Sequence, residues 1–370
     1  MQVAATKPRV CIYAPVDESG ESHRFLQAEG CEVIIGELTR GIGMTREALI
    51  GIGSGADVLM GATVRGGLLD QDFFEKFPDL RVVSKYTIGI EDVDLEVATD
   101  LGVIITHCPT EANWGGVAEG TLGFILALLK RLRERDAHVK KGGWRSPDLR
   151  GIYLGRRGDG YTGITVGIIG LGRVGSRVAD LLVPWRVRIL ACDPYVDHAT
   201  FVRHDSVGVD LPTLLRESDV VTLHCSLNMQ TRGLIGKEEL ALMKPGAVLV
   251  NTARGAILDL DALCDALEKN RLIGAALDVL PEEPPEKGAR VCSLGDKVIL
   301  SPHMISANGA GTLVAAIPWA TEATLMALKG NVPNHVCNID AIPKWKKRFG
   351  GKALISVSYT HLTLPTNREV

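Results

Sequence analysis

Short apolar runs alternate with amphipathic segments along the first part of the chain. The runs read RVCIYA, CEVIIG, ADVLMG and RVVSKY, at residues 9–14, 31–36, 56–61 and 81–86. Runs of this length that are rich in Val and Ile predict buried strands. The segments between them mix polar and apolar residues in the manner of amphipathic helices. Strands that alternate with helices predict βαβ units and a parallel sheet.

The same alternation resumes after Gly163. Further apolar runs cover residues 164–170, 186–193, 219–225, 247–253, 273–279 and 297–303. Two separate series of this kind predict an α/β fold with two Rossmann-like units. One is a doubly wound parallel-sheet domain at residues 113–305. The other is a smaller flavodoxin-like domain, discontinuous in sequence, formed by residues 1–112 and 306–340.

Two long helical patterns would connect these units. Residues 117–140 lack proline and repeat apolar residues at intervals of three and four, which predicts one long helix that crosses from one unit to the other. Residues 310–328 predict a second helix, broken or kinked at Pro318. This second helix would return the chain to the first unit.

Composition narrows the class of protein. A chain of 370 residues that is 46% hydrophobic can bury two ordinary cores. The formal net charge of −3 provides no basic surplus for a phosphate backbone, and the charge run at residues 130–136 mixes signs, as a solvated helix face does, so no nucleic-acid partner is expected. No uninterrupted apolar run reaches the roughly 18 residues of a membrane span. With no signal-peptide core at the N-terminus, we expect a cytoplasmic protein without a membrane partner.

The cysteines predict neither a metal site nor a disulfide framework. There are eight, scattered along the chain with no Cys-x-x-Cys pair. Several lie inside strand-like runs such as VCIYA, where a free thiol behaves as a small apolar side chain. We therefore expect reduced core residues.

We exclude the C-terminal tail from the fold prediction. Residues 357–366, VSYTHLTLPT, resemble the translation of a transposase adapter used in DNA sequencing libraries. We expect residues 356–370 to be a read-through artefact and the natural C-terminus to be absent. His361 is therefore given no functional role.

Two Gly-x-Gly-x-x-Gly matches occur, and their context separates them. Residues 158–163 follow a polar segment and precede a strand, the wrong order for a phosphate loop. Residues 170–175, Gly-Leu-Gly-Arg-Val-Gly, follow an apolar strand and open a helical pattern. In that order Gly170 allows the tight turn, Gly172 lets a pyrophosphate approach the backbone, and Gly175 lets the helix pack on the strand. Residues 170–175 are therefore the predicted dinucleotide loop.

An acidic residue follows the next strand, at the position that binds the ribose in dinucleotide-binding folds. Asp193 ends the run RVRILACD, eighteen residues beyond Gly175. A carboxylate there can accept hydrogen bonds from both ribose hydroxyls and would repel a 2′-phosphate. The sequence therefore favours NAD over NADP.

Three chemically capable side chains come directly after predicted strands of the second series. Arg254 follows the strand at 247–250, Glu283 the strand at 273–279, and His303 the strand at 298–300. The carboxyl ends of parallel strands are where open α/β sheets bind ligands. Singly, each residue has an ordinary structural explanation; together they make a carboxylate binder, a histidine, and a carboxylate that raises the basicity of that histidine.

These residues and their surroundings resemble the D-2-hydroxyacid dehydrogenases, the family of phosphoglycerate dehydrogenase and glyoxylate reductase. The resemblance runs from about residue 58 to about residue 328. It rests on the segments YTIGIEDVD, VAEGTLGFILALLKR, GGW, VGIIGLGRVGSRVA, CDPY, LHCSL, TRGLIG, LMKPGAVLVNTARGAILD, AALDVLPEEP and SPH.

The resemblance implies an NAD-dependent oxidoreductase that interconverts a D-2-hydroxy acid and its 2-keto acid. Arg254 would hold the substrate carboxylate and keto oxygen, His303 would be the general acid/base, and Glu283 would orient it. The 1–112 unit would bind the substrate through the backbone amides of Ile88 and Gly89, with the side chains of Tyr86 and Thr87 shaping specificity. The implied cofactor-binding residues are Gly170, Gly172, Arg173, Val174, Gly175, Asp193, His224, Cys225, Thr252, Ala253 and Asp278.

Other features stay open at this stage. An NAD-sensing binding protein of the same fold, like the C-terminal-binding-protein corepressors, would carry the same three residues and is the alternative. By resemblance we expect a homodimer through the helix at 117–140. Ile305 stands where family members place a small residue, which predicts a tighter wall around the nicotinamide or substrate.

Overall fold

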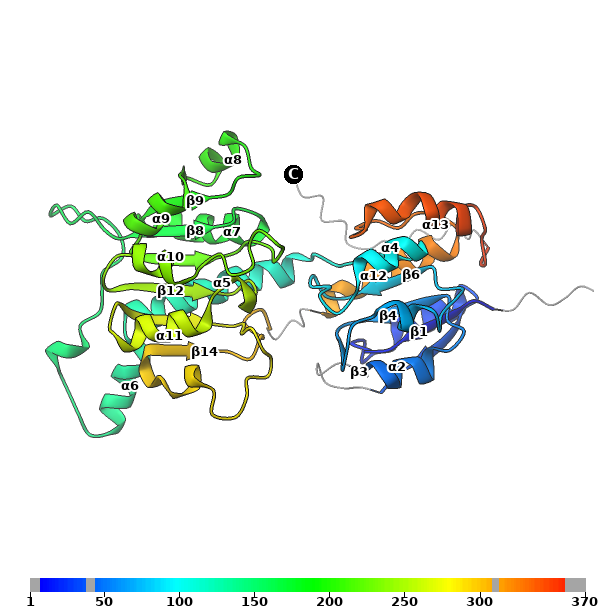
Figure 1. The fold of residues 1–370 in the computed structure, drawn as a ribbon, viewed down its shortest axis with the longest axis horizontal. Coiled ribbons are helices and arrows are strands. Elements are labelled where there is room, and N and C mark those ends of the chain that lie inside the picture. Colours follow the sequence, from blue (N-terminus) through cyan, green and yellow to red (C-terminus); the bar gives the residue numbers. More distant parts are fainter. Residues whose placement is uncertain (1–6, 38–43, 308–312, 357–370) are drawn as a thin grey trace, which may run out of the picture. The chain divides into compact units, whose positions relative to one another are not determined.

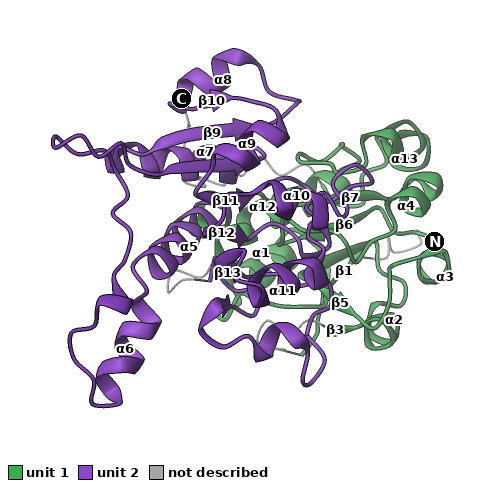
Figure 2. Ribbon diagram, turned by 60° about the vertical axis from the view of Figure 1, so that its left-hand side comes forward, with its two compact units in different colours: residues 1–113, 309–370 green, residues 114–308 purple. Residues whose placement is uncertain are grey.

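The computed structural model describes residues 7–37, 44–307 and 313–356. The chain divides into two compact units, residues 1–113 with 309–370 (unit 1) and residues 114–308 (unit 2), coloured separately in Figure 2. All of the predicted tail except Ser356 lies outside the described residues.

Unit 2 is built on a seven-stranded sheet in which every pair of neighbours is parallel (Figure 1). The order is β10-β9-β8-β11-β12-β13-β14, so the first long strand, β8, lies between β9 and β11. The strand order reverses at this point, which is where doubly wound sheets bind their ligands. The strands are β8 (Thr165–Ile169), β9 (Arg188–Cys192), β10 (Val207–Gly208), β11 (Val220–Leu223), β12 (Ala247–Asn251), β13 (Leu272–Leu277) and β14 (Val298–Leu300).

Helices cover both faces of this sheet, and the alternation of side chains along each strand supplies the two cores. For example, Leu249 packs with α9, α10 and α11, whereas its neighbours Val248 and Val250 pack with α5 and α7. Aspartates begin several of these helices by accepting amide hydrogen bonds, as Asp210 and Asp259 do. The helices are α5 (Glu111–Leu129), α6 (Leu132–Lys140), α7 (Arg173–Leu182), α8 (His198–Arg203), α9 (Leu211–Glu217), α10 (Lys237–Leu242) and α11 (Leu260–Glu268).

Unit 1 contains a five-stranded parallel sheet in the order β2-β1-β4-β6-β7, and β3 pairs with β5 in a separate small sheet. Counted along the main sheet alone, this is the 2-1-3-4-5 order of flavodoxin-like folds. The strands are β1 (Arg9–Ile12), β2 (Glu32–Ile35), β3 (Met44–Thr45), β4 (Val58–Gly61), β5 (Val64–Arg65), β6 (Val82–Lys85) and β7 (Ile104–Thr106). The predicted fold class, two Rossmann-like parallel-sheet units, is therefore confirmed.

Chain segments from both ends of the sequence complete unit 1. Its helices are α1 (Glu21–Ala28), α2 (Arg46–Gly53), α3 (Gln71–Phe74), α4 (Leu95–Leu101), α12 (Ile317–Leu328) and α13 (Ile342–Phe349). The packing continues beyond residue 340, where the predicted domain ends. Trp345 is fully buried, and its indole N–H donates to the Arg81 carbonyl over 2.8 Å. The Arg81 guanidinium in turn donates to the carbonyls of Ala327 and Lys352.

Two helix predictions need correction. The expected single helix at 117–140 begins earlier, at Glu111, and is interrupted after Leu129, because Arg131 adopts a left-handed φ of 53°. Pro318 does not kink a helix; it lies in the first turn of α12, where a missing N–H costs nothing. Residues 310–312 of that prediction lie outside the described residues.

One helix of the described chain, α5, is long and apolar enough to cross a membrane by length and composition alone. Five of its side chains are buried within the protein: Ala118, Thr121, Phe124, Ile125 and Leu129. These buried positions explain the apolar composition of α5, which is that of a helix packed on a sheet.

Candidate active site

The residues predicted for unit 2 gather along one edge of its sheet. They follow the carboxyl ends of successive strands: residues 170–175 after β8, Asp193 after β9, His224 and Cys225 after β11, Thr252 to Arg254 after β12, Asp278 and Glu283 after β13, and His303 after β14. Because every strand runs the same way, residues far apart in sequence are brought to one edge.

The glycine loop has the packing that a pyrophosphate cradle needs. Gly170 has a φ of 90°, and a Cβ there would lie 2.6 Å from the Cys225 nitrogen. A Cβ at Gly175 would lie 2.0 Å from the Gly170 oxygen, so only glycine lets α7 approach the strand. Gly172, the N-cap of α7, would meet nothing within 4 Å, which leaves open space at the positive end of the helix.

The remaining loop residues also fit a dinucleotide. Arg173 and Val174 form the first turn of α7. Asp193 accepts hydrogen bonds from the amides of Leu171 (2.8 Å) and Tyr195 (2.9 Å), so its carboxylate is fixed beside the glycine loop. Each carboxylate oxygen has a second lone pair available for a ribose hydroxyl. These residues would hold the pyrophosphate and the adenosine ribose of NAD.

His224 lies at this edge, but its ring is turned inward. Nε2 lies 2.9 Å from the Thr222 hydroxyl, and Nδ1 is buried with no hydrogen-bond partner among the described residues. Burial lowers the pKa of His224 to about 3, so the imidazole is neutral. Its amide donates to the Ile169 carbonyl over 2.7 Å. What His224 and Cys225 present beside Gly170 is therefore their backbone.

Thr252 and Ala253 form a tight corner after β12. The Thr252 hydroxyl lies 2.9 Å from that of Thr121 on α5, and both residues are buried. The buried side chain of Asn251 accepts from the Ala253 amide and donates to the Arg254 carbonyl, each over 3.0 Å. Asn251 was not predicted as a site residue, although its place at the end of a buried strand was a usable signal. It holds the backbone from which Arg254 projects.

His303 and Glu283 form a direct pair. Nδ1 of His303 lies 2.7 Å from Oε2 of Glu283, and Oε1 of the same carboxylate accepts from the Leu280 amide over 2.9 Å. The hydrogen bond that His303 donates to Glu283 raises the pKa of His303, although partial burial opposes it. Burial works to raise the pKa of Glu283, but hydrogen bonds from His303 and Leu280 outweigh it and the net pKa is lowered. The pair therefore favours an imidazolium next to a carboxylate.

The ring of His303 is presented outward by an uncommon backbone conformation. Its φ is 55°, in the left-handed region, and its side chain is 47% exposed. The buried residue Asp278 holds this turn: its carbonyl accepts from the His303 amide over 2.8 Å, and its Oδ1 accepts from the amides of Met304 (3.0 Å) and Ile305 (3.1 Å). Asp278, predicted to bind the cofactor, thus has a structural part in positioning His303.

Arg254 completes the cluster. It follows β12, and one guanidinium nitrogen donates to the Ala253 carbonyl over 2.7 Å. Its charge acts on both partners of the pair, lowering the pKa of Glu283 and opposing the rise in the pKa of His303. A cation, an acid/base group and its carboxylate therefore lie within electrostatic reach of one another.

Ile305 packs against α5 within unit 2. A Cβ built on Gly120 of α5 would lie 2.2 Å from the Ile305 Cγ1 and 2.9 Å from its carbonyl oxygen. Ile305 is partly buried against the α5/α7 core. The large side chain therefore fills the gap above a glycine and anchors the turn that carries His303, and the expected wall around the nicotinamide or substrate stays a prediction.

The predicted substrate residues of unit 1 follow β6. The ring of Tyr86 is 1% exposed and part of the unit 1 core, and its hydroxyl has no partner within the described ranges. The Thr87 hydroxyl donates to the Gly89 carbonyl over 2.7 Å. Tyr86 therefore packs inward and Thr87 braces the loop, while the part of these two side chains in specificity stays a prediction. Ile88 and Gly89 lie in that loop and are partly buried.

Comparison with known proteins assigns the family. Residues 122–304 match the model for the D-isomer specific 2-hydroxyacid dehydrogenase, NAD binding domain. A D-3-phosphoglycerate dehydrogenase from Methanocaldococcus jannaschii is 35% identical over 322 residues, which cover 84% of this chain and 57% of that protein. A glyoxylate reductase from Thermofilum pendens is 33% identical over 339 residues, which cover 91% of this chain and 96% of that protein. The chain belongs to the D-2-hydroxyacid dehydrogenase family.

Solved structures of similar fold agree with this assignment. A protein from Thermus thermophilus superposes with a TM-score of 0.75 at 30% identity, covering 89% of this chain and 99% of that one. A D-lactate dehydrogenase from Aquifex aeolicus, complexed with NAD and lactic acid, superposes with a TM-score of 0.73 at 25% identity, covering 91% and 98%. The predicted family, the class of NAD-dependent dehydrogenase and NAD as the cofactor are confirmed.

The contact between Gly120 and Ile305 in this dehydrogenase yields a stability prediction. Gly120→Ala should destabilise unit 2 by about 1–3 kcal/mol, because overpacking against Ile305 exceeds the roughly 1 kcal/mol that alanine gains over glycine in a helix. Urea unfolding measures the change. Gly123→Ala on the same helix is the control, since its Cβ would meet nothing within 4 Å. It should be neutral or stabilising.

A second variant shortens the side chain of Ile305, which the added methyl group would meet. Ile305→Ala in the Gly120→Ala background should recover much of the loss, because the added methyl then has room. If Gly120→Ala and Gly123→Ala shift the unfolding midpoint equally, Ile305 does not occupy the position described.

Proposed function

We propose that this chain catalyses the reversible, NAD-dependent reduction of a 2-keto acid to a D-2-hydroxy acid. The observation that carries the proposal is the hydrogen-bonded His303–Glu283 pair beside Arg254, on the sheet edge that also bears the glycine loop. The named relatives include a glyoxylate reductase, a phosphoglycerate dehydrogenase and a D-lactate dehydrogenase, all of which are named for 2-hydroxy or 2-keto acids.

Arg254 binds the substrate in this proposal. Its planar guanidinium offers paired donors to the carboxylate and the keto oxygen, which the point charge of a lysine would not match. In unit 1, the backbone amides of Ile88 and Gly89 are the proposed donors to a substrate carboxylate. Thr87 supports that loop through its bond to the Gly89 carbonyl.

His303 moves the proton. Because Nδ1 is engaged by Glu283, Nε2 is the nitrogen that gives a proton to the keto oxygen in reduction and takes it back in oxidation. When bound, NADH would supply the hydride to the keto carbon in reduction, and NAD would accept it in oxidation. Glu283 keeps the imidazole oriented and favours its charged form, which is the form needed for reduction.

Asp193 supports the preference for NAD within this proposal. Its carboxylate is fixed next to the glycine loop and would repel a 2′-phosphate. The substrate is resolved experimentally by a panel of glyoxylate, hydroxypyruvate and phenylpyruvate, each with NADH and with NADPH. NADH binding without turnover of any keto acid would favour the corepressor-like alternative.

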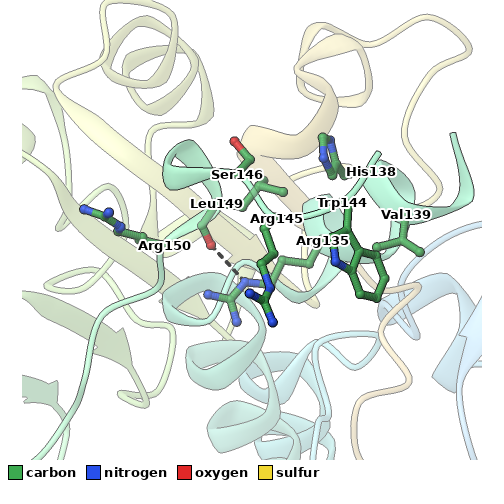
Figure 3. A pocket seen from close by; sticks show the side chains of 8 residues that line it. All are labelled: Arg135, His138, Val139, Trp144, Arg145, Ser146, Leu149 and Arg150. Atoms are coloured by element: carbon green, nitrogen blue, oxygen red, sulfur yellow. Dashed lines mark hydrogen bonds between the residues drawn. The ribbon is translucent and has the colours of Figure 1, made fainter. Parts of the chain in front are cut away.

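We further propose that two copies associate through unit 2. No residue of α6 is buried within the chain, and Leu132 and Val139 on that helix are each 50% exposed. Trp144, in the segment after α6, is 74% exposed. Trp144 lines a hollow of about 370 Å³ together with Arg135, Arg145 and Arg150, whose side chains are drawn in Figure 3. An unpartnered helix with an exposed indole is typical of a surface that a second subunit covers.

A cytoplasmic location also belongs to the proposal. All eight cysteines carry free thiols, which persist in reducing compartments.

The first prediction from the proposed function concerns His303. His303→Asn should lower kcat for keto-acid reduction by about 10²–10⁴-fold with little change in NADH affinity, because the proton donor is lost while asparagine tolerates the left-handed backbone. Steady-state kinetics and NADH fluorescence titration measure the two effects. His204→Asn is the control, since His204 forms a similar pair with Asp180 over 2.8 Å elsewhere in unit 2. Equal losses in the two variants would contradict the assignment.

The second prediction concerns pH. The raised pKa of His303 means that kcat/KM for reduction should fall only as pH rises through a value above 6.5, where the imidazolium is lost. The stability that the pair contributes is likewise present below 6.5 and lost as pH rises through that folded-state pKa. In Glu283→Gln the activity limb should move to lower pH. An unchanged profile in the variant would exclude Glu283 as the group that sets the pKa.

The third prediction concerns assembly. Trp144→Ser should weaken the dimer by about 2 kcal/mol or more, as removal of an aromatic interface anchor does. Analytical ultracentrifugation over a concentration series gives the dissociation constant. Tyr195→Ser, an aromatic residue that is 77% exposed elsewhere on unit 2, should leave it unchanged. A monomeric parent chain at micromolar concentration would overturn the proposal.

A further inference from the structure

A fully buried lysine stands next to the predicted substrate loop. Lys85, the last residue of β6, has a side chain that is 0% exposed, and its Nζ lies 2.5 Å from Oδ2 of Asp92, which is 10% exposed. The same oxygen accepts from the Val64 amide over 2.7 Å. The lysine Nζ also lies 6.0 Å from the centre of the Tyr13 ring. Buried charges of this kind are costly unless paired, so the two residues depend on each other.

The pair closes the base of a short loop. Between its members lie only residues 86–91, which include Ile88 and Gly89. The backbone of Asp92 is fixed as well, because its carbonyl accepts from the Leu69 amide over 2.8 Å. On the other side, the Tyr86 amide donates to the Gly61 carbonyl over 2.8 Å. Both ends of the loop are therefore tied to the unit 1 core, and the ion pair joins the two ends directly.

The middle of the loop makes longer hydrogen bonds than its two ends do. The Thr87 carbonyl accepts from the Cys108 amide over 3.2 Å, and the Ile88 carbonyl lies 3.2 Å from Nδ1 of His107. Both contacts are made by carbonyl oxygens of the loop. Its amide N–H groups therefore point in other directions. A carboxylate bound by backbone amides requires those amides to keep their direction, and that direction is set by where the loop ends are anchored.

We propose that the Lys85–Asp92 ion pair positions the substrate loop, and that Lys85 and Asp92 are positioning residues that determine the affinity for the keto acid. The inference rests on the proposed function, because it takes the loop to bind the substrate carboxylate. Neither side chain contacts the substrate in this arrangement. Their effect is on the geometry of the amides at Ile88 and Gly89.

The test separates positioning from simple support of the fold. Lys85→Met and Asp92→Asn each leave one buried charge unpaired, so each is expected to lower the unfolding midpoint. The double variant Lys85→Met/Asp92→Asn contains no buried charge, and its asparagine oxygen can still accept from the Val64 amide. Its stability should therefore return toward that of the parent. The loop, however, has lost the bond that joins its ends.

The decisive readout is KM for the keto acid in the double variant. We expect it to be raised about ten- to a hundredfold, the scale on which small misplacements of binding groups act. NADH affinity, which depends on unit 2, should stay within about twofold. Arg46→Met is the control, because it removes another ion pair of unit 1, between Arg46 and Asp70, at 2.5 Å. It should leave KM unchanged.

The outcomes are distinguishable. A double variant that regains both stability and the parental KM would show that the pair only supports the fold, which overturns the inference while the proposed function stands. A parent chain that binds NADH and reduces no keto acid would overturn both. A raised KM with recovered stability and unchanged NADH affinity supports the positioning role.

Discussion

The parallel direction of the strands in unit 2 is the constraint on which its chemistry depends. Seven strands that all run one way end at the same edge, and the loops that leave that edge carry the glycine loop, Arg254, Glu283 and His303. A mixed sheet would send some of these loops to the opposite edge. The switch point between β8 and β11 then places the glycine loop in the middle of the row.

Buried polar side chains then fix the backbone of the loops that carry the site residues. Asn251 binds the backbone on both sides of the corner that carries Arg254, and Asp278 binds the turn that carries His303. Each uses a side chain to satisfy backbone groups left unpaired where a strand ends. The left-handed conformation of His303 is maintained by such bonds. The packing of Ile305 on Gly120 of α5 also holds this turn in place.

Much of the fold could be predicted from the sequence, and the failures have identifiable causes. The long apolar runs marked most strands of both sheets, whereas β7, β10 and the short pair β3 and β5 were not predicted; β10 has only two residues, both exposed. The helix at 117–140 was predicted as continuous because it lacks proline and its apolar residues recur at intervals of three and four; Arg131 interrupts it through a left-handed backbone angle that an arginine residue does not signal. Burial is not a local signal either: Tyr86 is the first residue of the substrate loop, yet its ring packs into the core.

By itself, the sequence determined the chemical identities and their order along the chain: the strand periodicity, the Gly170–Gly175 loop, Asp193, and the row of Arg254, Glu283 and His303. These are local signals, because each residue's neighbours show whether it follows a strand. Only the tertiary structure decided which side chains meet. The 2.7 Å bond between His303 and Glu283, the pairing of Lys85 with Asp92, and the fit of Ile305 over Gly120 join residues that are near only after folding. Such contacts depend on the packing of whole elements, which no local pattern records.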